Sequence, residues 1–345
     1  MKKRLFMLTL ALVFVFALIG CTPQAQEPTP TPTAEATPTA EPNEPTDNPT
    51  PAVKVKIATL AGPTGMGLIQ LMDDANSDKY DISIYTAPDQ ILPKIIKGEV
   101  DIASVPANLA AMLYNKTDKG IKVLVTNGLG VLYIVENGDS INTVADLKGK
   151  TINAIGQAAT PEYILNEILK KNDLTAGEDV TIKYSTQIPE LANMVVAGDV
   201  KIALLPEPFV SVVTAKNKDV KVKIDINEEW KEAFGKNRGI AMSATIVNTK
   251  FLEEHPEAVQ AFMKDYQASI KFVNEKPNEA AELIAEKKIV GSAAIAAQAI
   301  PRCNLVYLDG KISKEMLMEY YQTLFDSDPK SVGGTLPDAN LYYMP

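Results

Sequence analysis

Two short loops carry residue types that could bind a small molecule, because each combines small residues with hydroxyl or amide groups after an apolar stretch. The first loop spans residues 62–66 (GPTGM), and the second spans residues 157–160 (QAAT) directly after a glycine. Glycine lets the backbone approach a ligand closely, and free N–H groups at the start of a helix attract an anion or a polar group. We therefore predict that both loops contact a ligand.

A second pair of candidate segments, 106–108 (PAN) and 206–208 (PEP), ends two passages of nearly the same pattern. The first passage reads IIKGEVDIASVPA, and the second, 100 residues later, reads VVAGDVKIALLPE. Each pattern indicates a helix end closed by glycine, a tight turn and a short buried strand that runs into proline. We expect a loop or a helix start at each proline.

The elements that would position these loops also occur in pairs. Residues 55–72 and 150–169 each combine a short apolar strand, a glycine-containing loop and an amphipathic helix. Such phrases could recur by chance in any α/β chain. Because both pairs follow the same order along the chain, we favour a duplicated architecture of two α/β lobes.

The chain is predicted to pass between the lobes twice, near residues 136–140 and 241–246. Lobe 1 would then comprise 53–138 and 244–345, and lobe 2 would comprise 139–243. In open α/β sheets a ligand binds beyond the carboxyl ends of the strands, and a cleft between hinged lobes can enclose a small molecule. Tyr85, at the end of a predicted strand, and Asn127, between two apolar strands, complete the site. The predicted ligand-binding residues are Gly62, Pro63, Thr64, Gly65, Met66, Tyr85, Pro106, Ala107, Asn108, Asn127, Gln157, Ala158, Ala159, Thr160, Pro206, Glu207 and Pro208.

The charge of the ligand depends on Glu207 and on the few arginines. An unpaired buried carboxylate is costly, so a Glu207 that faces the cleft would favour a ligand with N–H donors. Alternatively, Glu207 faces solvent or pairs with a lysine, and Arg302 forms a structural ion pair. Without an arginine, an anion would depend on the helix starts at Thr64 and Thr160. Tyr85, Phe209 and Trp230 could stack on a flat ring or belong to the core. Together these residues favour a neutral or cationic heteroaromatic ligand over a sulfonate.

Several classes of function find no support in the residues. The chain has one histidine, His255, and two cysteines, Cys21 and Cys303, so no usual metal site or nucleophile–base pair can form. We expect Cys303 to be a small buried residue, and we expect no metal and no cofactor. The net charge of −9 without a basic stripe argues against nucleic acid.

The first 52 residues indicate export and attachment to a membrane. A basic start at 2–4 precedes an apolar run that ends in Leu-Ile-Gly-Cys, the bacterial lipobox pattern. We predict a signal peptide at 1–21 and a lipid on Cys21; an ordinary signal peptide or an uncleaved anchor is the alternative. Residues 22–52 are rich in Thr, Pro, Glu and Ala and predict an extended, disordered tether.

The lipobox, the Thr/Pro tether, GEVDIASVP, DLKGKTI, PEP at 206–208 and AIPRCN at 299–304 together resemble the extracellular solute-binding lipoproteins of ABC importers. The likeness is strongest to the group that binds sulfonates, nitrate and thiamine-type pyrimidine precursors. The resemblance implies an α/β, two-lobed type II periplasmic-binding-protein fold with two hinge crossings and a ligand cleft between the lobes. It also implies a protein, lipid-anchored on the outer face of the cell membrane, that delivers a small solute to a permease and its ATPase. Nothing in the sequence demands more than a monomer.

Two other functions are compatible with the same fold. A cofactor-biosynthesis enzyme, such as a thiamine-pyrimidine synthase, would require a catalytic histidine and a cysteine-rich segment, and the chain has neither. Acid–base chemistry by Asp89, Asp101 or Glu207 lacks any pairing signal. A surface protein that senses a ligand and signals to a membrane partner differs little in sequence from a transport protein.

Overall fold

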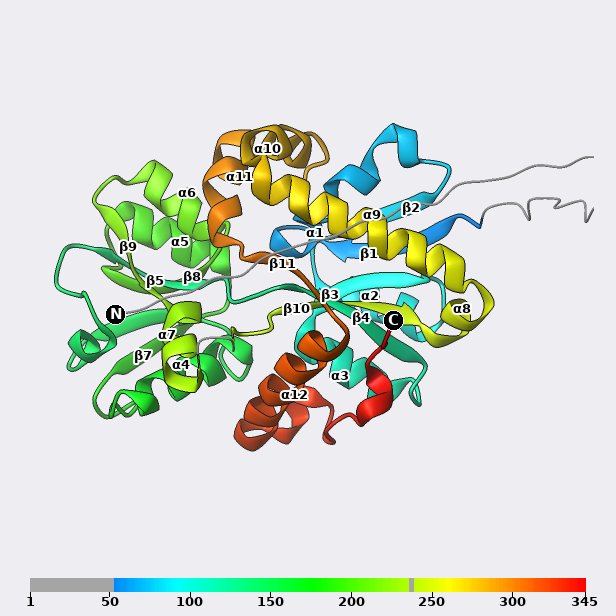
Figure 1. Cartoon of the computed structure of the whole chain (residues 1–345). Helices are drawn as coiled ribbons and strands as arrows, with labels where there is room; N and C mark the ends of the chain where they lie inside the picture. The colour runs from blue at the N-terminus through cyan, green and yellow to red at the C-terminus, as the bar shows by residue number, and fades with distance from the viewer. Residues whose placement is uncertain (1–52, 236–238) are drawn as a thin grey trace, which may run out of the picture. The chain divides into compact units, whose positions relative to one another are not determined.

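Two β-sheets, each covered by helices, form the part of the chain that the computed structural model describes, residues 53–235 and 239–345. The predicted signal peptide, lipobox and tether lie outside these residues. The described residues group as one compact unit. Figure 1 shows the strands of both sheets with helices packed around them.

The first sheet has six strands in the order β2-β1-β3-β10-β4-β11. Strands β1, β2 and β3 are parallel, whereas β10 runs antiparallel to both β3 and β4. The strands are β1 (Val55–Leu60), β2 (Tyr80–Tyr85), β3 (Ile102–Pro106), β4 (Ile121–Gly128), β10 (Ser243–Asn248) and β11 (Leu305–Asp309).

The second sheet has five strands in the order β7-β6-β8-β5-β9. Strand β6 is parallel to β7 and β8, and β5 runs antiparallel to β8 and β9. The strands are β5 (Leu132–Asn137), β6 (Thr151–Ile155), β7 (Thr181–Ser185), β8 (Ile202–Pro206) and β9 (Val220–Asp225).

The two sheets have corresponding orders, as a duplicated architecture requires. The order β2-β1-β3-β10-β4 matches β7-β6-β8-β5-β9, with one antiparallel strand inserted at the same place in each sheet. Strands β3 and β8, which carry the repeated sequence pattern, end at Pro106 and Pro206. The glycine before β8, Gly198, closes a helix in the left-handed conformation, at φ 85°, where residues with a side chain are strained.

The inserted strands show where the chain passes between the sheets, and the first crossing differs from the prediction. Strand β5 pairs in the second sheet, so the crossing lies at residues 129–131 and not near 136–140. The lobe boundary predicted after residue 138 is therefore one strand too late. Strands β4 and β5 are consecutive and apolar, and β4 ends in Asn127-Gly128, a pair typical of hairpin turns, although the two strands belong to different sheets. The return strand β10 begins at Ser243, next to the predicted boundary.

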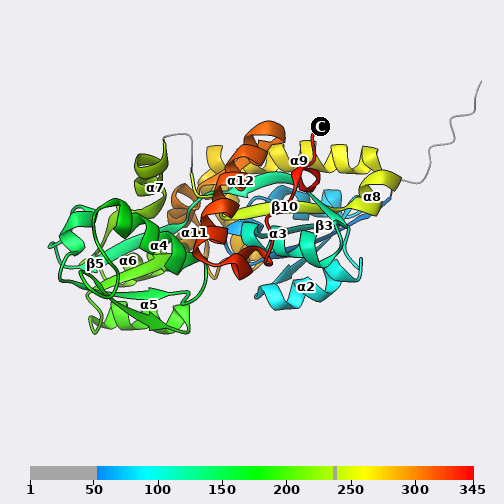
Figure 2. The same ribbon diagram turned by 90° about the horizontal axis from the view of Figure 1, so that it is seen from below.

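Helices cover both faces of each sheet, which is why the central strands are almost continuously apolar. One face of the first sheet packs against α2, α3 and α12, and the other packs against α9, α10 and α11 (Figures 1 and 2). In the second sheet, α4 and α7 cover one face and α5 and α6 the other. The α-helices are α1 (Pro63–Met66), α2 (Pro88–Ile96), α3 (Ala107–Lys116), α4 (Thr160–Lys171), α5 (Ile188–Ala197), α6 (Phe209–Lys216), α7 (Ile226–Phe234), α8 (Thr249–Glu254), α9 (Pro256–Glu275), α10 (Pro277–Glu286), α11 (Ala293–Ala299) and α12 (Gly310–Ser327).

Short 3₁₀ turns complete the elements, and the last of them attach the C-terminal segment to the first sheet. Asp338 accepts hydrogen bonds from Tyr114 on α3, at 2.6 Å, and from Lys119, at 2.8 Å. The backbone N–H of Tyr343 donates to Val123 on β4. The 3₁₀ turns are η1 (Ile69–Met72), η2 (Asp74–Asn76), η3 (Val144–Leu147), η4 (Ile300–Arg302), η5 (Pro329–Val332) and η6 (Ala339–Leu341).

Replacing Asp338 tests how firmly this segment is held. The hydrogen bonds from Lys119 and Tyr114 lower the pKa of the Asp338 carboxyl, so its ionised form stabilises the folded chain. This stabilisation is complete above the unfolded pKa of about 3.9 and is lost as the pH falls towards the lowered folded value. We expect Asp338→Asn to reduce the melting temperature at neutral pH, with the difference from wild type narrowing below about pH 4. Thermal unfolding across pH measures this, and Asp78→Asn, at an exposed carboxylate, is the control. Equal melting temperatures at neutral pH would contradict the expectation.

Candidate functional site

A cavity of about 150 Å³ lies where the strand ends of the two sheets meet. Its wall comes from loops after β1, β3, β4 and β8 and from the segment that enters β10. It therefore lies at the carboxyl ends of strands of both sheets, the usual ligand position in open α/β sheets. The lining residues are Pro63, Thr64, Pro106, Gly128, Leu129, Val131, Glu207, Met242, Ser243 and Cys303.

The loop after β1 reaches the cavity because two of its glycines allow a tight turn. Gly62 has a φ of 85°, which favours glycine, and it precedes Pro63 at the start of α1. A Cβ atom on Gly65 would lie 2.5 Å from the Leu60 carbonyl oxygen, so no larger residue fits there. The turn brings Pro63 and Thr64 to the cavity wall.

Four of the residues predicted for the site line this cavity: Pro63, Thr64, Pro106 and Glu207. Gly62 and Pro208 lie beside it and face each other, since a Cβ on Gly62 would be 4.0 Å from the Pro208 ring. Pro206 ends β8 directly before Glu207. The structure thus brings the two proline-containing segments of the repeat and the first glycine loop to one place.

Other predicted residues are buried in the core of the first sheet, outside the cavity lining. Met66 and Ala107 are fully buried. Asn127 is also buried, and its side-chain amide donates to the Tyr266 hydroxyl at 2.8 Å. Asn127 therefore contributes to a polar network inside the sheet, because its position in β4 directs its side chain towards α9.

The remaining predicted residues lie elsewhere on the surface of the described region. Tyr85 packs against the core at the end of β2, and Asn108 donates to the Ser331 carbonyl. Residues 157–159 (Gln157, Ala158 and Ala159) are exposed, and Ala158 donates its N–H to Glu162. Thr160 is the first residue of α4, where the sequence predicted a helix start, and Ala159 is the N-cap.

The lining residues that the sequence did not single out come mainly from the two crossings. Leu129 and Val131 belong to the first crossing, which the sequence placed too late, and Gly128 ends the strand before it. Met242 belongs to the second crossing, and Ser243 begins the strand after it. Cys303 follows η4; it is fully buried, and burial raises the pKa of its thiol well above the ordinary value. Correct placement of the first crossing would have directed attention to residues 128–131.

Glu207 is the charged residue in the described lining, and its partners are fixed. Its side chain is fully buried and accepts hydrogen bonds from the Arg302 Nε and from both the N–H and the hydroxyl of Ser211, the last two at 3.1 Å. Arg302 Nη2 also donates to the Ser211 hydroxyl at 2.8 Å. Burial raises the pKa of the Glu207 carboxyl, and the contacts with Arg302 and Ser211 oppose that rise. A lysine was one of the alternatives for the partner of Glu207; the partner is Arg302, which forms the structural ion pair expected for this arginine.

Both crossings are held by one buried side chain, Asn227 on α7. Its Oδ1 accepts the N–H of Gly130, at 3.3 Å, and the N–H of Ile240, at 3.0 Å. A Cβ on Gly130 would lie 2.7 Å from the Asn227 Cβ, so glycine is needed for this approach. The carbonyl of Gly130 accepts a further hydrogen bond from Asn304. Asn227 thus joins the two segments that carry Leu129 and Met242 to the cavity wall.

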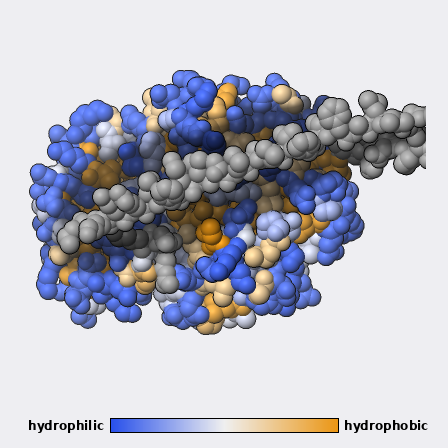
Figure 3. Space-filling model, in the orientation of Figure 1, coloured by the Kyte–Doolittle hydropathy of each residue, from blue (hydrophilic) through white to orange (hydrophobic). Residues whose placement is uncertain are grey.

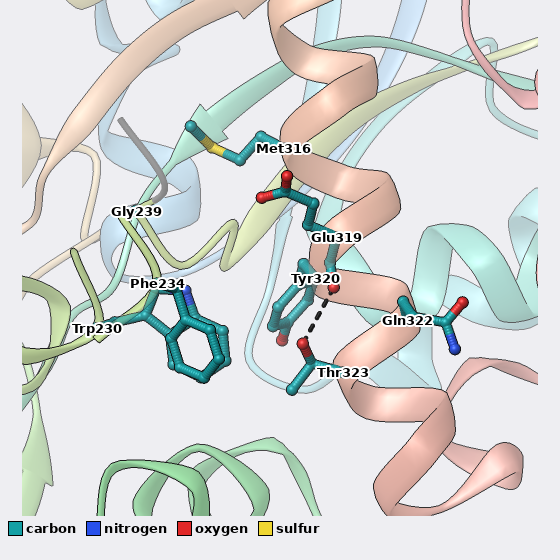
Figure 4. A pocket seen from close by; sticks show the side chains of 8 residues that line it. All are labelled: Trp230, Phe234, Gly239, Met316, Glu319, Tyr320, Gln322 and Thr323. Carbon is teal, nitrogen blue, oxygen red and sulfur yellow. Dashed lines mark hydrogen bonds between the residues drawn. The ribbon is translucent and has the colours of Figure 1, made fainter. Parts of the chain in front are cut away.

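A second cavity, of about 240 Å³, lies between α7 and α12 (Figure 4). The rings of Trp230 and Phe234 lie 4.3 Å apart on one side, facing Tyr320 of α12 on the other. Gln322 points away from the rings. Trp230 is nearly fully buried, so the predicted stacking residue belongs to this helix–helix contact and not to the lining at the strand ends.

The described surface is mostly hydrophilic on the face that Figure 3 shows, with hydrophobic residues gathered near its centre. Within residues 53–235 and 239–345, no group of three or more His, Cys, Asp or Glu side chains could hold a metal ion. None of the described helices is long and apolar enough to cross a membrane.

Solved structures share this architecture. An ABC transporter structure from Parabacteroides distasonis superposes with a TM-score of 0.72 at 27% identity, covering 84% of this chain and 98% of that one. The periplasmic aliphatic sulphonate binding protein of Escherichia coli gives a TM-score of 0.65 at 18% identity, covering 85% of this chain and 92% of that one. The fold is therefore the two-lobed type II periplasmic-binding-protein fold.

A curated relative and a family model agree with the structural likeness. A Bacillus subtilis (strain 168) protein that carries the name of an aliphatic sulfonates-binding protein is 32% identical over 165 residues. That match spans 48% of this chain and 45% of the relative, less than half of its length. The family model described as NMT1/THI5 like matches residues 81–280, more than half of the chain. The chain belongs to the NMT1/THI5-like family.

Proposed function

We propose that the protein is the solute-binding component of an ABC importer and holds its solute in the cavity at the strand ends. The observation that carries this function is that residues of both sheets and of both crossings line one small cavity. Movement about the crossings would open and close that space around a solute. The names of the similar proteins, an ABC transporter and aliphatic sulfonates-binding proteins, support the same role.

The location and partners of the protein follow from this role and from the start of the sequence. The basic start, apolar run and Leu-Ile-Gly-Cys pattern favour a signal peptide and lipid attachment at Cys21. An anchored monomer on the outer face of the membrane would capture the solute and deliver it to a permease driven by an ATPase. Residues 22–52, rich in Thr, Pro and Glu, would provide the reach between anchor and folded part.

Filling the cavity should abolish solute binding without unfolding the protein. Val131 lines the cavity, so Val131→Trp would fill much of its volume, whereas Val222 is an exposed valine on β9 and lies outside the lining. A solute at about a hundred times its dissociation constant adds roughly 2.7 kcal/mol of stability, a rise of several degrees in melting temperature. We expect thermal unfolding with a panel of aminopyrimidines, nucleobases, nitrate and alkyl sulfonates to show such a rise in wild type and in Val222→Trp, and none in Val131→Trp. An equal rise in Val131→Trp would place the solute elsewhere.

Removing the Asn227 carboxamide should loosen both crossings together. Asn227→Leu deletes the acceptor of two buried backbone N–H groups, and each lost hydrogen bond costs about 1–3 kcal/mol. We expect the amides of Gly130 and Ile240 to exchange with deuterium about tenfold faster or more, measured by mass spectrometry on the full chain. Asn227→Asp keeps an acceptor oxygen and should restore protection. Asn217→Leu, in the turn before β9, is the control. Equal deuterium exchange of the Gly130 and Ile240 amides in Asn227→Leu and Asn217→Leu would show that Asn227 does not hold the two crossings.

The proposed lipid on Cys21 is tested separately, by removing the thiol. Cys21→Ser removes the thiol that would carry the diacylglycerol, so the protein should appear in the soluble fraction while wild type stays with the membrane. Cell fractionation with radiolabelled palmitate measures both location and lipid. Retention of the serine variant in the membrane fraction would show that another feature anchors the chain.

A further inference from the structure

We propose that Glu207 occupies the hydrogen-bond donors that an anion would need beside the solute cavity, so that the cavity excludes small anions and takes an uncharged solute. The inference rests on the proposed function and specifies the class of solute for the same cavity. It differs from the ligand named for the similar sulfonate-binding proteins.

The carboxylate already occupies the donors that an anionic solute would need. Glu207 lies before α6 and accepts the Ser211 N–H in the first turn of that helix, where the backbone favours negative charge. It also accepts from the Ser211 hydroxyl and from Arg302. Arg302 Nη2 donates to the same hydroxyl, so the guanidinium is directed at this side-chain cluster. An arginine and a helix start are the usual partners of a sulfonate or phosphate, and here both serve a protein carboxylate.

The rest of the described lining offers an anion little compensation. None of the residues that line the cavity in the described part of the chain is Lys or Arg. The lining is mainly apolar, with Thr64, Ser243 and Cys303 as its uncharged polar side chains. The buried Glu207 carboxylate is paired with Arg302, so this guanidinium offers no free positive charge to an anion that would leave water for the cavity. An uncharged solute needs no such charge, because its hydrogen bonds can be met by the uncharged polar groups of the lining.

Removing the charge of Glu207 should therefore create anion binding. Glu207→Ser clears the carboxylate and leaves Arg302 and the Ser211 N–H available, and Glu207→Gln removes the charge while keeping the shape. We expect isothermal titration of the full chain with ethanesulfonate to show binding at least about tenfold tighter in Glu207→Ser than in wild type, with Glu207→Gln between them. Circular dichroism and thermal unfolding would verify that each variant folds, and the glutamine variant keeps the test informative if the serine variant does not.

Glu136 supplies a matched control, because it is a second buried carboxylate that accepts from the N–H and the hydroxyl of a serine four residues later, Ser140. It lies outside the cavity lining, so Glu136→Gln and Glu136→Ser should leave ethanesulfonate binding at the wild-type level. If ethanesulfonate binds wild type as tightly as the Glu207 variants, or if these variants gain nothing over the Glu136 pair, the proposal is overturned. Tight wild-type binding would still support solute capture. Failure of the proposed function would instead appear as unchanged solute binding in Val131→Trp.

Discussion

The hydrogen bonds that Asn227 accepts from both crossings are the constraint on which the arrangement of the two sheets depends. Each crossing carries a strand into the middle of the other sheet, where β5 and β10 run antiparallel to their neighbours. Because the first crossing spans only residues 129–131, its backbone polar groups must be satisfied at once, by Asn227 for the Gly130 N–H and by Asn304 for the Gly130 carbonyl. The same short segment places Leu129 and Val131 on the cavity wall. The geometry that joins the sheets thus also builds the candidate site.

The ion pair of Glu207 and Arg302 is a second connection between segments of the two sheets, next to the cavity. Glu207 follows a strand of the second sheet, whereas Arg302 belongs to η4, between α11 and a strand of the first sheet. A buried charge is tolerated only when it is paired and hydrogen-bonded, and Glu207 meets this condition through Arg302 and Ser211. Opening the lobes by separating these segments would expose Glu207 to water, which lowers the cost of breaking the pair. The ion pair can therefore hold the segment after β8 against η4 without preventing the lobes from opening.

The sequence predicted the architecture because the repeated passages are local patterns. Gly198, the apolar strand β8 and Pro206 follow one another within a few residues, and each has its own conformational preference. The partner of β5 could not be predicted in the same way, since strand pairing depends on residues far apart in the chain and β5 is apolar on both faces. Residues Asn127 and Met66 were assigned to the site for a related reason. A position close to a strand end does not determine towards which face of the sheet the side chain points.

The site itself could be predicted where a loop end forces residues towards the neighbouring sheet. Pro63, Pro106 and Glu207 line the cavity because the strand before each of them stops there. Ser243 and Cys303 became part of the lining only through the second crossing and η4, and neither residue lies in the repeated passages or in the two glycine-containing loops. The consequence for recognition is that most of the wall consists of uncharged groups, with the one lining carboxylate already paired in the described structure. Shape and a few hydrogen bonds would then decide which solute is bound, because a charged solute gains nothing from a pair that is already neutral.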